Sequence, residues 1–231
     1  TMVVSMSRWV MAGVLVVAGS ISAVSAQTPV VMAQGLDNPR GMAFGPDGAI
    51  YVVEAGRGGT SSLCLAVPTG PGQRCYGATG AVTRVLTGTP LQQGRVLGGL
   101  PSIAVQSGAE ATGPHDIDFG FNAAFITVGS GGDPATLQPF RTAGIPFGNL
   151  LLVTYTGQIT PIVDVAASET ARNPDGGLLD SNLYSLDITN TRGIVTDAGA
   201  NALLQIAPDL SITTLAVFPE RTVAGPGGNV Q

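Results

Sequence analysis

The chain has 231 residues, of which 44% are hydrophobic and 11% charged, so it is long enough to bury a core. Its 33 glycines and 16 prolines disfavour long helices. The net charge of -5 excludes a surface built to bind nucleic acid or anionic membranes, because such a surface needs clustered cations.

The first 26 residues have the pattern of a secretory signal peptide. Arg8 supplies the positive charge, an apolar run extends from about Val10 to Val17, and Val24 and Ala26 provide a cleavage site after Ala26. The alternative is an anchor helix, but the run falls short of the roughly 20 apolar residues that a span requires. We therefore expect a secreted or periplasmic protein with no membrane span after cleavage.

Three related β-hairpins follow along the chain, at 38–56, 113–129 and 182–199. Each copy alternates apolar and polar residues on both sides of a short turn, which predicts two antiparallel strands. In the first copy the turn is Gly45-Pro-Asp-Gly48, which is ordinary turn chemistry. A fixed unit that recurs in this way is typical of repeat architectures.

A second hairpin follows each of these three, beginning at Gly80, Gly148 and Ala200. Two hairpins make four antiparallel strands, which is the content of one propeller blade. We therefore predict an all-β fold and assign residues 27–231 to a partial β-propeller. Its blades are expected at roughly 38–100, 113–166 and 182–219.

Two insertions, at 57–79 and 130–147, account for the wide spacing of the blades. The first contains Cys64 and Cys75, which are the two cysteines of the chain. In an oxidising compartment we expect them to form a disulfide that holds this insertion. The alternative, a pair of free or metal-bound thiols, has too few ligands for a metal site.

Three blades cannot close a ring, because propellers use about four to eight. Residues 28–36 resemble the outer strand at 213–219, and an outer strand placed ahead of the first blade would close a ring by pairing with the last one. We therefore expect this chain to be a fragment, about half of a six-bladed protein, with the ring not closed. Should the protein end at Gln231, an oligomer would have to complete the ring.

Four segments together carry a family likeness: NPRGMAFGPDGAIYVVEAG, GSGGDP, NPDGGLLDSN and VTDAGANALLQIAPDLSITTLAVFP. They resemble the ScyD/ScyE family of exported bacterial proteins, which is related more distantly to NHL-repeat and gluconolactonase-type propellers. The likeness extends over nearly all of residues 29–231. The resemblance implies a six-bladed propeller, and it assigns no catalytic role to any residue of this chain.

Equivalent positions of the three first hairpins carry Arg40, His115 and Tyr184. Because these positions lie near the central channel of a propeller, the resemblance points to a channel site formed by these residues with Asp116. The alternative is a polar channel lining that only satisfies the strand ends. His115 is the single histidine of the chain, which excludes three-histidine zinc sites and HExxH sites within it.

Glu54 and Asp197 end the second strand of the first and third blades, and each is followed by Ala-Gly. Carboxylates that face one axis could hold a divalent cation, Ca²⁺ or Mg²⁺. The middle blade has Val128 and Gly129 there, which breaks the pattern. The alternative is a carboxylate that accepts hydrogen bonds from the backbone of the next turn. The run from 173 to 182 is likewise rich in oxygen ligands and in turn formers.

All ten basic residues are arginine, which excludes Schiff-base enzymes and phosphate-loop NTPases. No complete catalytic set is present, so the sequence favours an exported binding or scaffold module that meets a small molecule or a protein at one propeller face. The alternative is a metal-assisted hydrolase or lyase resembling gluconolactonase or virginiamycin lyase, with its site in the central channel.

Overall fold

The computed structural model describes residues 29–67, 71–88, 91–219, 223–225 and 228–230. The predicted signal peptide, 1–26, lies outside these residues. Residues 29–31 belong to a separate compact unit, and Met32–Gln231 form the other. Residues 29–34 form no strand, which differs from the outer strand expected there. Within the described part, no helix is long and apolar enough to cross a membrane.

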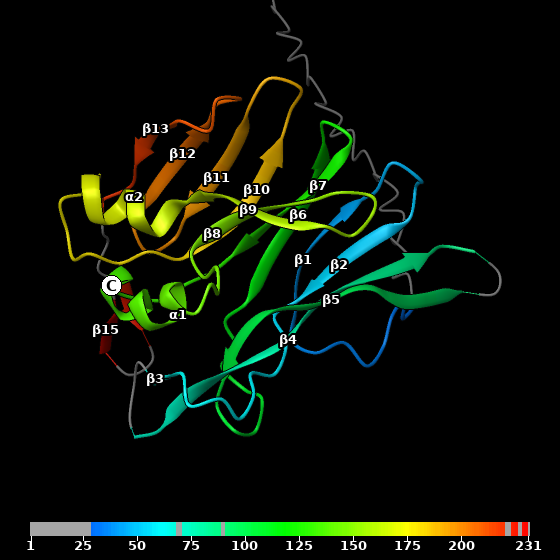
Figure 1. Cartoon of the computed structure of the whole chain (residues 1–231), viewed down its shortest axis with the longest axis horizontal. Helices are drawn as coiled ribbons and strands as arrows, with labels where there is room; N and C mark the ends of the chain where they lie inside the picture. Colours follow the sequence, from blue (N-terminus) through cyan, green and yellow to red (C-terminus); the bar gives the residue numbers. More distant parts are fainter. Residues whose placement is uncertain (1–28, 68–70, 89–90, 220–222, 226–227, 231) are drawn as a thin grey trace, which may run out of the picture. The chain divides into compact units, whose positions relative to one another are not determined.

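The first sheet has five antiparallel strands, and their order in the sheet departs from their order in the sequence (Figure 1). Along one edge of the long strand β4, residues 73–75 pair with β3 and residues 81–85 pair with β2, while β5 pairs along its other edge. The five strands are β1 (Pro39–Phe44), β2 (Ile50–Glu54), β3 (Cys64–Ala66), β4 (Gln73–Leu86) and β5 (Gln92–Ala104).

Two further sheets are four-stranded antiparallel meanders in sequence order. The second contains β6 (Pro114–Gly120), β7 (Ala123–Val128), β8 (Asn149–Val153) and β9 (Ile159–Asp164). The third contains β10 (Leu183–Ile188), β11 (Gly193–Asp197), β12 (Ala202–Ile206) and β13 (Ile212–Val217). A separate two-stranded sheet pairs β14 (Val223–Gly225) with β15 (Gly228–Val230).

Consecutive sheets pack face to face through alternating apolar residues. Val53 and Leu100 of the first sheet meet Ile126 and Leu151 of the second in one core. The opposite face of the second sheet packs on the third through a separate core that includes Val195. The first strands β1, β6 and β10 lie side by side. This is the all-β, propeller-like arrangement that the hairpin repeats predict, and three sheets of four or five strands build it.

The first strands of the three sheets, β1, β6 and β10, are called the inner strands, and neighbouring ones pack closely together. Asp116 on β6 accepts a hydrogen bond from the backbone N–H of Leu186 on β10 at 3.0 Å. On the other side, Gly41 of β1 lies so near that an added Cβ would collide with the Asp116 carboxylate and lie 2.8 Å from the carbonyl of His115. The absence of a side chain at Gly41 is therefore what lets β1 approach β6.

Short helices occupy two of the connections between strands, where no secondary structure was predicted. The second insertion, 130–147, contains a 3₁₀ turn, η1 (Pro134–Leu137), followed by α1 (Gln138–Thr142). Helix α2 (Val165–Arg172) begins directly after β9. Asp164 starts it by accepting a hydrogen bond from the N–H of Ala167 at 2.8 Å, and Asn173 ends it in the left-handed conformation.

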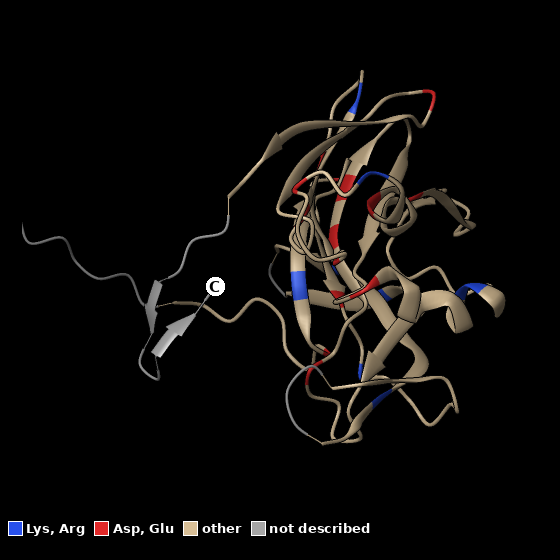
Figure 2. Ribbon diagram, turned by 90° about the vertical axis from the view of Figure 1, so that its left-hand side faces the viewer, with Lys and Arg blue, Asp and Glu red and all other residues tan. Residues whose placement is uncertain are grey.

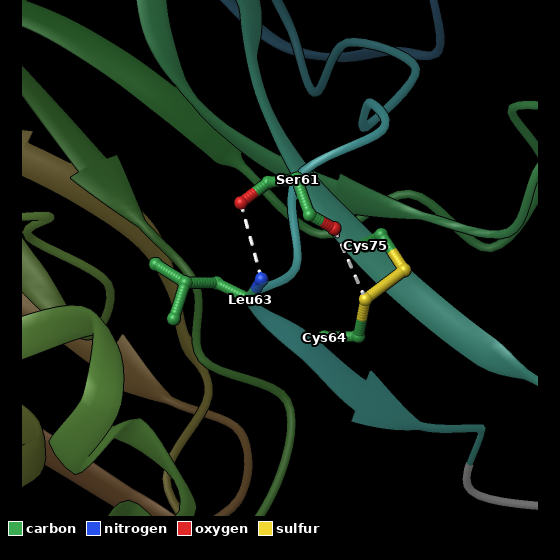
Figure 3. The surroundings of a disulfide bond; sticks show 4 residues. All are labelled: Ser61, Leu63, Cys64 and Cys75. Carbon is green, nitrogen blue, oxygen red and sulfur yellow. Dashed lines mark hydrogen bonds between the residues drawn. A yellow bond between two sulfur atoms is a disulfide. The ribbon is translucent and has the colours of Figure 1, made fainter.

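The predicted disulfide is present and joins Cys64 of β3 to Cys75 of β4 (Figure 3). The two cysteines are register partners, so the bond crosses directly between paired strands. Just before β3, the N–H of Leu63 donates to Oγ of Ser61 at 3.1 Å. The first insertion is thus a hairpin that extends the first sheet and is fastened near its base.

Charged residues are few and dispersed over the described ribbon, with both signs interspersed (Figure 2). Five ion pairs form among the described residues, and they involve Arg57, Arg84, Arg95 and Arg141. The pair between Arg141 and Asp164 fastens α1 to the start of α2.

Candidate functional site

The inner strand of each sheet has a β-bulge at the same place. Between the register pairs Pro39–Glu54 and Met42–Val52 of the first sheet, β1 carries one residue more than β2. The same irregularity follows Pro114 on β6 and Leu183 on β10. A bulge releases a residue from the ladder and re-aims its side chain, often beside a functional site.

The bulges bring Arg40, His115 and Tyr184 to one polar cleft with a volume of about 420 Å³. Three of the four residues that the sequence predicts for a channel site therefore line the same space. The fourth, Asp116, does not line it, because its carboxylate accepts the N–H groups of Ile117 and Leu186. Burial raises the pKa of Asp116.

His115 is buried, with only 5% of its surface exposed. Its Nδ1 lies 3.0 Å from the carbonyl oxygen of Leu183. Because a carbonyl can only accept, Nδ1 carries the proton and Nε2 is left as an acceptor. Burial lowers the pKa of His115 to about 4, and the charge of Arg40 acts in the same direction. The imidazole is therefore neutral at physiological pH.

Gly129 makes room for this imidazole. An added Cβ there would lie 2.7 Å from both Nδ1 of His115 and the side-chain oxygen of Asn182. Gly129 follows the position where the other two sheets carry Glu54 and Asp197, so the middle sheet departs from the repeat at the place where the histidine ring sits. The ring also packs beside Tyr184, with 4.8 Å between the ring centroids.

Glu54 is fully buried and accepts hydrogen bonds from two side chains and one backbone N–H group. The donors are Arg95 at 2.7 and 3.0 Å, Thr83 Oγ1 at 2.6 Å and the N–H of Asp37 at 2.5 Å. Burial alone would raise the pKa of Glu54, but the bonds from Arg95, Asp37 and Thr83 outweigh it and hold the pKa below its ordinary value. Protein donors thus engage both oxygens.

Asp197 has an equally complete set of donors. It accepts from Ser181 Oγ at 2.7 Å and from the N–H groups of Asn182, Gly199 and Ala200 at 2.6 to 3.2 Å. These contacts match the alternative of a carboxylate that binds the next turn. Among the described residues, no group of three His, Cys, Asp or Glu side chains is arranged to hold a metal ion. A cation at Glu54 or Asp197 stays a prediction.

Five further residues line the cleft: Arg74, Glu110, Ala111, Thr112 and Asn182. The sequence indicated Asn182 only as part of the oxygen-rich run 173–182 and missed the other four. Arg74 comes from the disulfide-bonded insertion, which lies outside the repeat and so has no equivalent in the other sheets. The available signal was its place immediately before Cys75, since a fastened hairpin holds its neighbouring residues in fixed positions.

Two other hollows, of about 350 and 320 Å³, open between neighbouring sheets. Apolar side chains such as Phe119 and Phe125 line most of their surface. We place the candidate site in the polar cleft because convergent polar groups from all three sheets can fix the orientation of a ligand there.

Fold and site together define an all-β, propeller-like protein with a polar cleft where its inner strands begin. No family model and no curated protein matches the chain. Among solved structures it is similar to a streptogramin B lyase, with 11% identity, a TM-score of 0.30, and coverage of 78% of this chain and 69% of that one. The propeller-like assignment rests on the three sheets themselves.

Proposed function

We propose that the protein is an exported binding module of the ScyD/ScyE type, which takes a ligand in the polar cleft. The observation that carries this proposal is the convergence of Arg40, His115 and Tyr184 from equivalent bulges of three sheets. Hydrogen bonding between strands does not require these three side chains to meet, whereas a ligand site requires polar side chains that converge on one space.

The cleft supplies the contacts of a binding site. The neutral His115 presents Nε2 as a hydrogen-bond acceptor, and the ring of Tyr184, which is 44% exposed, offers a face for packing. The side-chain oxygen of Asn182 is buried without a partner, so a ligand hydroxyl or amide could satisfy it. A small molecule with several polar groups fits this arrangement.

Export and processing are part of the same proposal. We infer that residues 1–26 are removed, that residues 27–231 form part of a larger six-bladed propeller, and that the blades are the three sheets described above. The disulfide supports an oxidising compartment. Secretion of the full chain followed by sequencing of its N-terminus should find Gln27 first; retention of Thr1 would contradict export by this route.

The binding proposal is tested by a thermal-shift screen of the exported chain against neutral sugars, aromatic compounds, amino acids and organic acids, followed by calorimetric titration. We expect at least one class to raise the Tm, and Tyr184→Ala and His115→Gln to weaken that ligand by about tenfold. Tyr155→Ala is the matched control, because Tyr155 is an exposed tyrosine outside the cleft.

Two outcomes would overturn this proposal. One is the absence of any ligand whose binding depends on Tyr184 or His115. The other is metal-dependent turnover of a lactone, which would favour the hydrolase or lyase alternative and would be abolished by chelation.

A further inference from the structure

We propose that the ligand carries an oxyanion, a carboxylate or a phosphate, which is bound between the guanidinium groups of Arg40 and Arg74. This inference rests on the proposed function, since it names the chemical class of the ligand in the same cleft.

Both arginines are without a carboxylate partner in the part of the chain that the structure describes. Among the described residues, neither takes part in an ion pair within 4.0 Å. Arg74 is only 5% exposed, and its Nε is buried without a hydrogen-bond partner. A buried charge is normally paired, because removing it from water is costly. The unsatisfied donor of Arg74 therefore supports a partner that lies outside the described residues.

Adjacent residues anchor the two guanidinium groups. Arg40 donates from Nη2 to the carbonyl oxygen of Ala111 at 3.0 Å. Arg74 donates from Nη1 to Oγ1 of Thr112 at 3.1 Å. Each guanidinium has five N–H donors, so these single bonds hold the groups in place and leave further donors free. Paired N–H donors suit the oxygens of carboxylates and phosphates.

The charge of the cleft favours an anion. Glu110 is the one carboxylate that lines the cleft together with the two arginines. It lies near enough to oppose the effect of burial, which lowers the pKa of Arg74, but it does not approach within ion-pair distance. Two cations therefore face one exposed carboxylate and a neutral imidazole, and an oxyanion would balance the charge.

The disulfide holds Arg74 in this position. Arg74 is the register partner of Leu65 and directly precedes Cys75, so the fastened hairpin determines where its side chain enters the cleft. His115 and Asn182 line the same cleft and offer acceptors. A carboxylate or phosphate ester that also bears hydroxyl groups would use both halves of the site.

The single histidine gives a direct measurement. We would titrate the tag-free, oxidised full chain with inorganic phosphate and with glycolate, and use ethylene glycol as the neutral control. The NMR signals of His115 report binding, and calorimetry gives the Kd. We expect one or both anions, but not ethylene glycol, to shift these signals and to raise the pKa of His115. A stronger response to phosphate or to glycolate distinguishes the two sources.

Arg40→Gln and Arg74→Gln should each weaken anion binding by about tenfold. The matched control is Arg192→Gln, because Arg192 is an exposed arginine in the turn between β10 and β11, outside the cleft. If Arg74→Gln does not fold, Glu110→Gln provides the test: removal of its negative charge should tighten anion binding by about threefold.

Equal losses in Arg192→Gln, or no response to either anion at saturating concentration, would overturn the oxyanion inference. A neutral ligand that binds with dependence on Tyr184 would then leave the proposed function standing. If no ligand of any class perturbs His115, both proposals fail.

Discussion

Two kinds of buried carboxylate occur in this protein, and they differ in what surrounds them. Glu54 and Asp197 stand at equivalent strand ends, and each accepts hydrogen bonds from several donors. Glu169 on α2 is 3% exposed, yet neither of its oxygens has a hydrogen-bond partner. Burial by itself therefore says little about the state of a carboxylate, because the donors around it decide whether the charged form is stable.

The surroundings of Glu169 explain its behaviour. Burial raises its pKa to about 7, and the negative charges of Asp197, Asp175 and Asp180 add to this effect. Arg172 lies near Glu169, but its guanidinium donates to the carbonyl of Ile212. The folded chain therefore holds a proton on Glu169 that the unfolded chain would release at lower pH.

The largest effect is expected from Glu54→Ala. The change removes the common acceptor of Arg95, Thr83 and the Asp37 N–H, so we expect a loss of about 3 kcal/mol in the free energy of unfolding. Urea denaturation measures it. Asp187→Ala is the control, since Asp187 is exposed on β10, and it should change stability by less than about 0.5 kcal/mol. Similar small losses in both variants would contradict the structural role of Glu54.

Asp197→Ala should have the next largest effect, a loss of about 2 kcal/mol. It leaves the N–H groups of Asn182, Gly199 and Ala200 without their acceptor, but it leaves no arginine without its carboxylate partner. The same denaturation experiment compares it with Glu54→Ala. If Asp197 bound Ca²⁺, the free energy of unfolding would depend on the metal. A wild-type free energy of unfolding that falls in EDTA would therefore contradict the role of Asp197 as an acceptor for backbone N–H groups alone.

Glu169→Gln should act in the opposite direction and by the smallest amount. A carboxyl whose pKa is higher in the folded state than in the unfolded state loses stability as pH rises between the two values, here from about 4.5 to about 7. The variant should lack this fall and therefore be more stable than wild type above pH 7. Because its amide also remains buried without partners, we expect the gain in the free energy of unfolding to be only about 1 kcal/mol. Parallel pH profiles of the two proteins in EDTA would contradict the burial of an ionisable Glu169.

Much of the fold could be predicted from sequence because a repeat carries register as well as strand content. Alignment of the three hairpins placed Arg40, His115 and Tyr184 at equivalent positions without any knowledge of the bulges. Asp116 was grouped with them because it follows His115, but the bulge makes His115 the extra residue, and Asp116 then returns to the ladder with its side chain between inner strands.

Features outside the repeat were harder to predict. Arg74 belongs to an insertion without equivalents, so only the three-dimensional course of the hairpin brings it to the cleft. Helix α2 was not predicted, and the predicted second blade, 113–166, ended at its first residues, although Asp164 followed by alanine and glutamate is a recognisable helix start. Both cases show that periodicity identifies repeated elements, whereas single connections need their own local signals.

The bulges also separate what the protein recognises from what keeps it folded. Residues 40, 115 and 184 lie in the bulges, where the pairing between strands is interrupted. Their side chains can therefore be exchanged without changing how the strands pair. Neighbouring Gly41, by contrast, admits no side chain at all. Relatives of this protein could therefore acquire new specificities by altering these three positions on an unchanged framework.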